Sequence, residues 1–163
     1  MKMANGKWQM ANGRGFTLVE LLVTVVLMSI LMLSSVMVFS SYTKSQTFQT
    51  GVKDITSILN KAKSRSISQV KPTICGTNTL DGYRLVFTPS GNDYKLQVLC
   101  GGSTHDVESG KLPSQVTFTD ISAGSVVFNT STGEVNSPAN IGVTGFGDTK
   151  TIGVDGIGNI SVQ

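Results

Sequence analysis

Residues 15–32 read Gly-Phe-Thr-Leu-Val-Glu-Leu-Leu-Val-Thr-Val-Val-Leu-Met-Ser-Ile-Leu-Met, and the apolar run continues to about residue 43 with Glu20 as its one charged side chain. The stretch 16–39 has about 24 residues and would be roughly 36 Å long as a helix, enough for a hydrocarbon core of about 30 Å. The run therefore predicts a membrane-spanning helix at residues 16–43. A carboxylate inside such a span costs on the order of 2.5 kcal/mol and needs a partner. Near the headgroups, in the first helical turn, the helix dipole would instead tolerate it.

The segment before the run, residues 1–15, carries Lys2, Lys7 and Arg14 and no acidic residue. Its Gly and Asn residues disfavour a helix, and its charge predicts a leader on the cytoplasmic side of a membrane. A secretory signal differs, because its apolar core has about 7–15 residues and ends at a small-residue cleavage site. Here the run is longer and no such site follows. Cleavage is therefore expected before the run, between Gly15 and Phe16.

Residues 15–22, Gly-Phe-Thr-Leu-Val-Glu-Leu-Leu, together with the basic leader and the apolar helix, resemble the class III signal of type IV pilins and type II secretion pseudopilins. The resemblance implies that a membrane aspartyl prepilin peptidase cuts after Gly15 and that the new terminus, Phe16, is N-methylated. It also implies that the helix stays in the lipid of the bacterial inner membrane until an inner-membrane assembly platform with an ATPase draws it into a filament of other pilins or pseudopilins. In that filament Glu20 would face the Phe16 amine of a neighbouring subunit, which lowers the cost of burying its charge.

Cleavage would also change the charge balance of the chain. The whole sequence has 13 Lys and Arg against 10 Asp and Glu, and removing the three basic residues of the leader leaves 10 against 10. Because little positive charge remains in excess, nucleic acid is not an expected partner. The basic residues that cluster after the apolar run are interpreted as a solvated helix face; they are Lys61, Lys63, Arg65 and Lys71.

Beyond the apolar run, residues at alternating spacings of four and three indicate one buried face of an amphipathic helix. The pattern predicts one helix over residues 16–70, limited by Pro72, because the residue before a proline is pushed out of helical geometry. Its amphipathic continuation, residues 44–71, is expected to pack on a sheet. The residues of this face are Phe48, Val52, Ile55, Leu59, Ala62 and Ser66.

After the helix the pattern changes to short segments rich in β-branched and aromatic residues, separated by turn-forming residues. Residues 72–163 are therefore predicted to form a small antiparallel sheet domain, in the periplasm or at the cell exterior. The fold class is α+β, and the resemblance implies a type IV pilin-like fold, with a C-terminal region similar to that of H-type pseudopilins and FimT-like minor pilins. The predicted strands are 83–88, 94–100, 115–119, 125–129, 150–155 and 158–162, and the glycines of 142–150 are assigned to strand and turn.

Cys75 and Cys100 both fall in the part expected outside the inner membrane. In an oxidising compartment they could form one disulfide, closing a loop of about 26 residues worth roughly 3 to 4 kcal/mol. Two reduced, buried thiols are the alternative. No metal site is expected, because neither cysteine is part of a Cys-x-x-Cys pair and the single histidine, His105, is interpreted as a loop residue. Oxygen ligands on the turns near Asp155 give only weak support for calcium.

No common catalytic or phosphate-binding motif is present, so neither an enzyme nor a cofactor is expected. The predicted function is a non-enzymatic filament subunit, a minor pilin or pseudopilin of a type II secretion or type IV pilus system. Met37 stands where many major pilins have proline, which favours a minor role over a major pilin. A DNA-binding minor pilin of natural transformation is an alternative, but no arginine follows Arg84 in this sequence. A membrane-anchored receptor-like protein is a third possibility.

Overall fold

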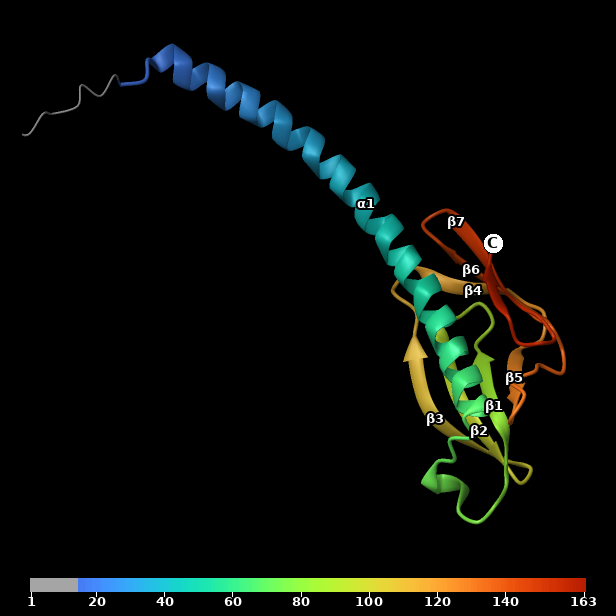
Figure 1. Cartoon of the computed structure of the whole chain (residues 1–163). Coiled ribbons are helices and arrows are strands. Elements are labelled where there is room, and N and C mark those ends of the chain that lie inside the picture. The colour runs from blue at the N-terminus through green and yellow to red at the C-terminus, as the bar shows by residue number, and fades with distance from the viewer. Residues whose placement is uncertain (1–14) are drawn as a thin grey trace, which may run out of the picture. The chain divides into compact units, whose positions relative to one another are not determined.

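The computed structural model describes residues 15–163, with the backbone alone described for 33–38. The chain divides into two compact units, Met1–Ser41 and Tyr42–Gln163, which are treated separately below. We call the second one the outer unit (Figure 1). The elements in chain order are α1 (Leu18–Ile67), a 3-10 turn (Thr73–Cys75), β1 (Leu80–Phe87), β2 (Asp93–Cys100), β3 (Ser103–Lys111), β4 (Val116–Ile121), β5 (Ser125–Asn129), β6 (Ala139–Gly145), β7 (Asp148–Val154) and β8 (Ile160–Val162).

In the first unit, the described residues from 18 onward belong to α1, and all described side chains between 15 and 32 are exposed. Within the part of the chain that the structure describes, no helix combines the length and the apolar character that a membrane crossing requires. The membrane span expected at 16–43 stays a prediction.

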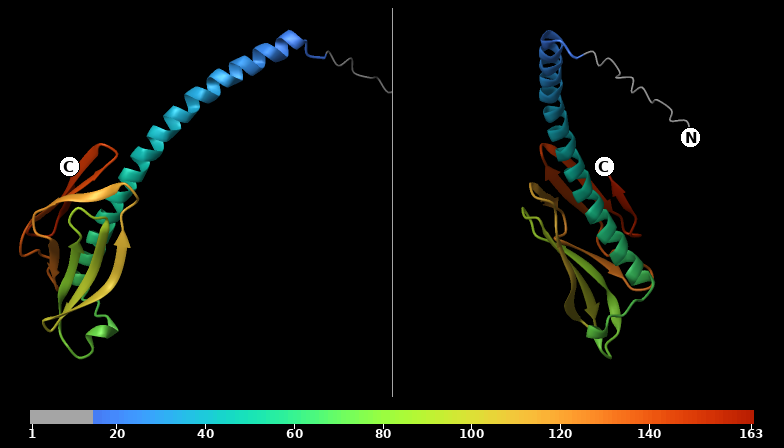
Figure 2. Two further views of the ribbon diagram at one scale, coloured as in Figure 1. Left: turned by 180° about the vertical axis from the view of Figure 1, so that it is seen from behind. Right: turned by 90° about the vertical axis from the view of Figure 1, so that its left-hand side faces the viewer.

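The outer unit contains two four-stranded antiparallel sheets. Sheet A has the order β3-β2-β1-β5 and sheet B the order β4-β6-β7-β8. Both sheets and the C-terminal half of α1 contribute to one hydrophobic core, which includes Leu59 from the helix, Leu85 from β1 and Ile152 from β7. Figure 2 shows from two further sides how α1 lies against the strands of this unit. The α+β fold with a helix packed on a small antiparallel β domain is thus confirmed.

The predicted apolar face of the helix is buried in this core. Phe48, Ile55, Leu59 and Ala62 are almost fully inaccessible to solvent. Burying a side chain as large as that of phenylalanine, isoleucine or leucine contributes about 1.5–3 kcal/mol. Ser66 is also buried, although it is polar. Its hydroxyl donates a hydrogen bond of 2.9 Å to the carbonyl oxygen of Phe128 in β5, which satisfies both groups.

The helix ends at Ile67, three residues before the predicted limit. Gln69 has a left-handed backbone with φ of 50°. The Val70 N–H donates to the Arg65 carbonyl at 3.0 Å and the Gln69 N–H to the Ser66 carbonyl at 3.2 Å, the pattern of a Schellman cap. The cap, formed before Pro72, therefore ends the helix.

Two strands were not predicted, and both are explained by pairing rather than by local preference. β3 is polar and lies at the edge of sheet A, where backbone pairing with β2 extends it. The assignment of His105 to a loop is therefore wrong, because His105 lies in β3 opposite Val98. β6 is rich in small residues but alternates Ile141 and Val143 into the core. With these two strands the domain has two sheets instead of one.

Candidate functional site

The first turn of α1 is closed by Thr17. Its hydroxyl oxygen accepts a hydrogen bond of 3.2 Å from the Glu20 backbone N–H, and its carbonyl accepts one of 3.1 Å from the Leu21 N–H. Thr17 is thus the N-cap, and Thr17-x-x-Glu20 has the sequence of a capping box. The sequence reasoning missed this role of Thr17, although the spacing from threonine to glutamate could have revealed it.

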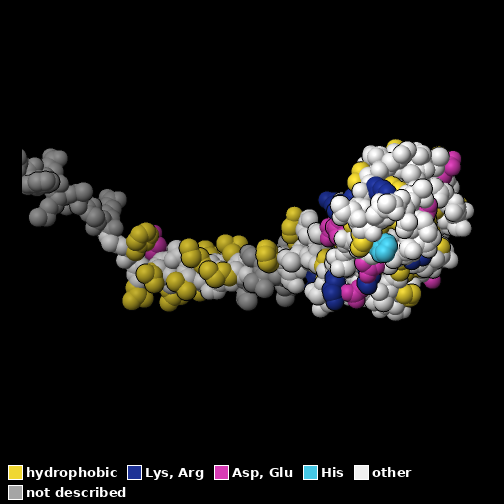
Figure 3. Space-filling view, turned by 90° about the horizontal axis from the view of Figure 1, so that it is seen from below, with side chains coloured by type: hydrophobic (Ala, Val, Ile, Leu, Met, Phe, Trp, Pro, Cys, Tyr) yellow, Lys and Arg dark blue, Asp and Glu magenta, His cyan; other side chains and the backbone are white. Residues whose placement is uncertain are grey.

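The Glu20 side chain is exposed on an apolar surface. Its neighbours Phe16, Leu18, Val19 and Leu21 are also exposed, with 77% of Phe16 accessible. Figure 3 shows hydrophobic side chains covering this stretch of the helix, with an acidic side chain at its start. Among the residues that the structure describes, no ion pair involves Glu20. The carboxylate is therefore available to a partner outside the described part of the chain.

The other polar side chains of this stretch are satisfied within the helix. The Thr24 hydroxyl donates to the Leu21 carbonyl at 2.8 Å, and the Ser29 hydroxyl to the Val25 carbonyl at 2.7 Å. Hydroxyl groups bonded in this way do not need solvent or another helix. Between residues 15 and 32, the Glu20 carboxylate is the one side-chain group left to be satisfied from outside the helix.

The predicted cleavage site lies just before the helix. Gly15 and Phe16 have no regular secondary structure, and a Cβ atom at Gly15 would meet nothing within 4 Å. Packing within the described residues therefore does not require glycine at this position. Lys2, Lys7 and Arg14 lie outside the described residues. The roles assigned to these five residues stay predictions.

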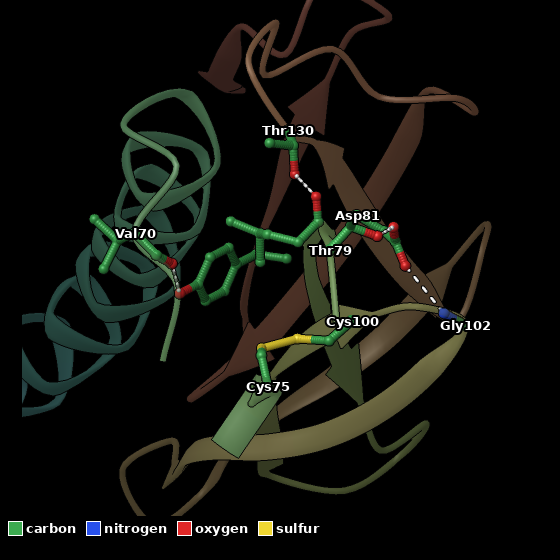
Figure 4. The surroundings of a disulfide bond; sticks show 9 residues. Val70, Cys75, Thr79, Asp81, Cys100, Gly102 and Thr130 are labelled. Atoms are coloured by element: carbon green, nitrogen blue, oxygen red, sulfur yellow. Dashed lines mark hydrogen bonds between the residues drawn. A yellow bond between two sulfur atoms is a disulfide. The ribbon is translucent and has the colours of Figure 1, made fainter. Parts of the chain in front are cut away.

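The outer unit contains a disulfide between Cys75, in the 3-10 turn, and Cys100, at the end of β2 (Figure 4). Their Cα atoms are 5.6 Å apart, and both residues are buried. Next to the bond, Asp81 accepts a hydrogen bond of 3.0 Å from the Gly102 N–H. The disulfide therefore connects the segment after the helix to the turn between β2 and β3.

Tyr83 anchors the end of the helix to β1. Its hydroxyl donates a hydrogen bond of 2.7 Å to the Val70 carbonyl, while its ring is buried. Burial raises the pKa of the Tyr83 phenol, and the positive charge of Arg65 partly offsets this rise. Burial likewise raises the pKa of Tyr94, as do the negative charges of Asp54 and Glu108. Both phenols thus stay protonated at neutral pH, and Tyr83 keeps its donor role.

The basic cluster predicted on the helix is partly used inside the outer unit. Lys61 forms an ion pair of 2.5 Å with Glu108 of β3. The side chain of Lys63 lies so close to Gly133 and Gly158 that a Cβ at either glycine would be 3.3–3.4 Å from it. A nucleic-acid surface would require such side chains to be free for phosphates. The contacts of Lys61 and Lys63 within the outer unit therefore account for these two basic residues without a nucleic-acid partner.

No group of three or more potential metal ligands occurs within residues 15–163 as the structure describes them. At the turn considered for calcium, Asp155 accepts a hydrogen bond of 2.6 Å from the Asn159 N–H through its side chain. This bond closes the turn between β7 and β8, so the carboxylate has a local structural role.

Comparison with protein families gives a match to the prokaryotic N-terminal methylation motif over residues 10–36. The matched stretch includes the predicted cleavage site and Glu20. No curated protein and no solved structure gives a significant match. The match supports a subunit of the pilin or pseudopilin type, and such a motif implies processing by a prepilin peptidase and assembly with other pilins. The likeness to H-type pseudopilins rests on the sequence pattern alone.

Proposed function

We propose that this chain is a non-enzymatic filament subunit, a minor pilin or pseudopilin of the H type, from a type II secretion or type IV pilus system. The proposed parts are a leader at 1–15, a membrane and filament-core helix at 16–43, its amphipathic continuation at 44–71, and a β domain at 72–163 in the periplasm or outside the cell. The observation that carries this proposal is an exposed apolar helix start within the methylation motif whose one charge, on Glu20, has no partner among the described residues.

Cleavage after Gly15 would create the missing partner. The new α-amino group at Phe16 carries a positive charge in its N-methylated form as well. Packing the apolar helices of neighbouring subunits would exchange lipid contacts for helix contacts, so the hydrophobic gain of that step is small. An unpaired carboxylate would oppose packing by several kcal/mol, whereas one facing the Phe16 amine of a neighbour costs much less. The pair would therefore select one register among the subunits.

The outer unit would contribute little to this step, because its buried polar side chains are satisfied within it. No buried side-chain nitrogen or oxygen in the described part of the chain lacks a hydrogen bond. Its helix end, turns and disulfide hold it together without a neighbour. We expect it to be carried on the filament as a preformed domain.

Mass spectrometry of the membrane fraction tests the proposal. In cells with an active prepilin peptidase, the mature protein should begin at Phe16 and carry one methyl group on its amine. A Gly15→Leu variant is the matched control: a Cβ atom at this position meets no described atom within 4 Å, and the larger side chain changes the peptidase site. It should retain residues 1–15. Recovery of the wild-type protein with an intact Met1 terminus would contradict the proposal.

A further inference from the structure

The two sheets have four edge strands, and β3 is the most heavily protected. Its charged residues are matched by ion pairs, Asp106 with Lys95 and Lys111 with Asp93, at 2.9 and 3.0 Å. A bulge also interrupts its pairing with β2. Charged side chains and bulges are the usual means by which an edge strand avoids pairing with another chain. β3 is therefore not an attractive docking edge.

The edges at β4 and β5 are covered in other ways. β4 has a bulge between Phe118 and Ile121, and its Phe118 N–H donates to the Gly91 carbonyl at 2.9 Å. The end of β5 pairs with a following segment through a bridge between Phe128 and Val135. Both edges thus already use part of their outward hydrogen-bonding groups.

β8, at the edge of sheet B, has none of these protections in the described chain. Residues 156–162 carry no charge and no proline. Thr151 and Gln163 exchange two hydrogen bonds, of 3.1 and 2.9 Å, across the pair of β7 and β8. Because such pairs alternate along antiparallel strands, Ser161 also bonds toward β7, while the N–H and C=O groups of Ile160 and Val162 point away from the sheet.

The side chains at this edge are also incompletely covered. Ile160 and Val162 lie opposite Val154 and Ile152, which are both buried. Val162 is nevertheless 42% exposed, and Ile157 in the preceding turn is 63% exposed. Another strand at this edge would cover apolar surface as well as satisfy the outward backbone groups.

We propose that β8 is a pairing site for the β8 strand of a second copy of this chain. In an antiparallel arrangement with Ser161 at the two-fold axis, Ile160 faces Val162 of the other copy and Val162 faces its Ile160. Both are then hydrogen-bonded pairs, so all of their outward N–H and C=O groups are used. The two Ser161 residues form the close, non-hydrogen-bonded pair between them.

A second copy fits this edge better than a charged partner, because two antiparallel β8 strands are complementary to each other in hydrogen bonding and in side chains. It has no charge to repel its copy, and one register satisfies every outward group of Ile160 and Val162. Such a contact is isologous and closes at two subunits, unlike the repeated contact that builds a filament. The inference goes beyond the proposed function and does not depend on it. The paired form would be a dimer that exists apart from the filament.

Cysteine cross-linking of the full chain in detergent or in membranes tests this pairing. Residues in a non-hydrogen-bonded pair have Cα atoms about 4.5 Å apart, which is within disulfide range. A Ser161→Cys variant should therefore form a disulfide-linked dimer under mild oxidation. Ser109→Cys, on the protected edge strand β3, is the matched exposed control. We expect about ten-fold more dimer from S161C than from S109C, as judged on non-reducing gels.

Two further variants identify the contact, and the first of them is made in the S161C chain. Val162→Pro removes an N–H that points away from β7, so the chain keeps its own ladder but loses bonds to the second copy. Its thermal unfolding should be unchanged while the cross-link falls about ten-fold.

Separately, Ser161→Lys in the otherwise unaltered chain should abolish dimers in sedimentation, because like charges would meet at the axis. Equal cross-linking of S161C and S109C, no effect of Val162→Pro, or assemblies larger than dimers would overturn the inference. Glu20→Ala should leave the dimer intact, which separates this test from that of the proposed function.

Discussion

The two halves of α1 follow the same local rules but bury different amounts of surface. In residues 18–32 every side chain is exposed, whereas in residues 42–67 one face is buried in the core of the outer unit. Hydroxyl groups bond back to the preceding turn in both halves, as at Ser29 and at Thr56. The halves therefore differ in what their apolar residues contact, not in how the helix is formed. We infer that the second half stabilises the protein and the first half serves its assembly.

The largest expected effect comes from removing a core side chain in the second half. Leu59→Ala should lower the free energy of unfolding by about 2–5 kcal/mol, because Leu59 is fully buried. Leu27→Ala is the matched change in the first half, where the side chain is exposed, and should alter unfolding by less than about 0.5 kcal/mol. Urea unfolding followed by circular dichroism measures both. Similar losses for the two variants would remove the distinction between the halves.

The disulfide should come next. Replacing Cys75 and Cys100 together by serine should cost about 2–4 kcal/mol, because the bond restricts a loop of about 26 residues in the unfolded chain. Reduction of the wild-type protein should shift its thermal midpoint in the same direction and leave the double variant unchanged. A midpoint insensitive to reductant would show that the disulfide does not stabilise the outer unit.

Ser66→Ala should have a smaller effect, about 0.5–1.5 kcal/mol, because the buried carbonyl of Phe128 would lose its hydrogen bond from the Ser66 hydroxyl. Ser64→Ala, two residues earlier on the exposed face, is the control and should be neutral or slightly stabilising. The difference between their denaturation midpoints gives the contribution of the buried bond. Equal midpoints would contradict the assigned role of Ser66.

The smallest effect concerns acid. Hydrogen bonds from Lys95 and Gln97 hold the pKa of Asp106 below its ordinary value of 3.8. The pKa of Asp106 is lower in the folded than in the unfolded protein. Its hydrogen bonds therefore stabilise the fold fully above the unfolded pKa of about 3.8, and this stabilisation is lost as the pH falls through the folded pKa. Asp106→Asn should therefore make unfolding slightly less sensitive to pH in this acidic range. The same sensitivity in the variant would show that Asp106 does not contribute.

Features set by periodicity were predicted, whereas features set by contacts between distant residues were not. The helix face from Phe48 to Ala62 follows from a repeat within one segment. β3 could not be predicted, because its polar residues are held in a strand by pairing with β2. The left-handed Gln69 of the helix cap and the hydrogen bond of Ser66 likewise depend on residues that pack around them.

At the candidate site the sequence pointed to Glu20 but not to Thr17. The charge stands out against an apolar run, and that contrast is visible in composition alone. The cap is recognised only when threonine and glutamate are considered as a pair three residues apart. The capping-box position also offers a second, purely structural explanation for a glutamate at residue 20. A test must therefore separate the effect of capping from the effect of charge.

Replacing Glu20 by glutamine makes that separation, and it is the most direct test of assembly through Glu20. Glutamine can complete a capping box as glutamate does, but it has no charge for an amine. In cells with the matching assembly machinery, Glu20→Gln and Glu20→Ala should both remove the subunit from sheared filaments, while the thermal unfolding of the outer unit stays unchanged. Filament incorporation of Glu20→Gln at the wild-type level would show that assembly does not depend on a charge contact between Glu20 and the Phe16 amine.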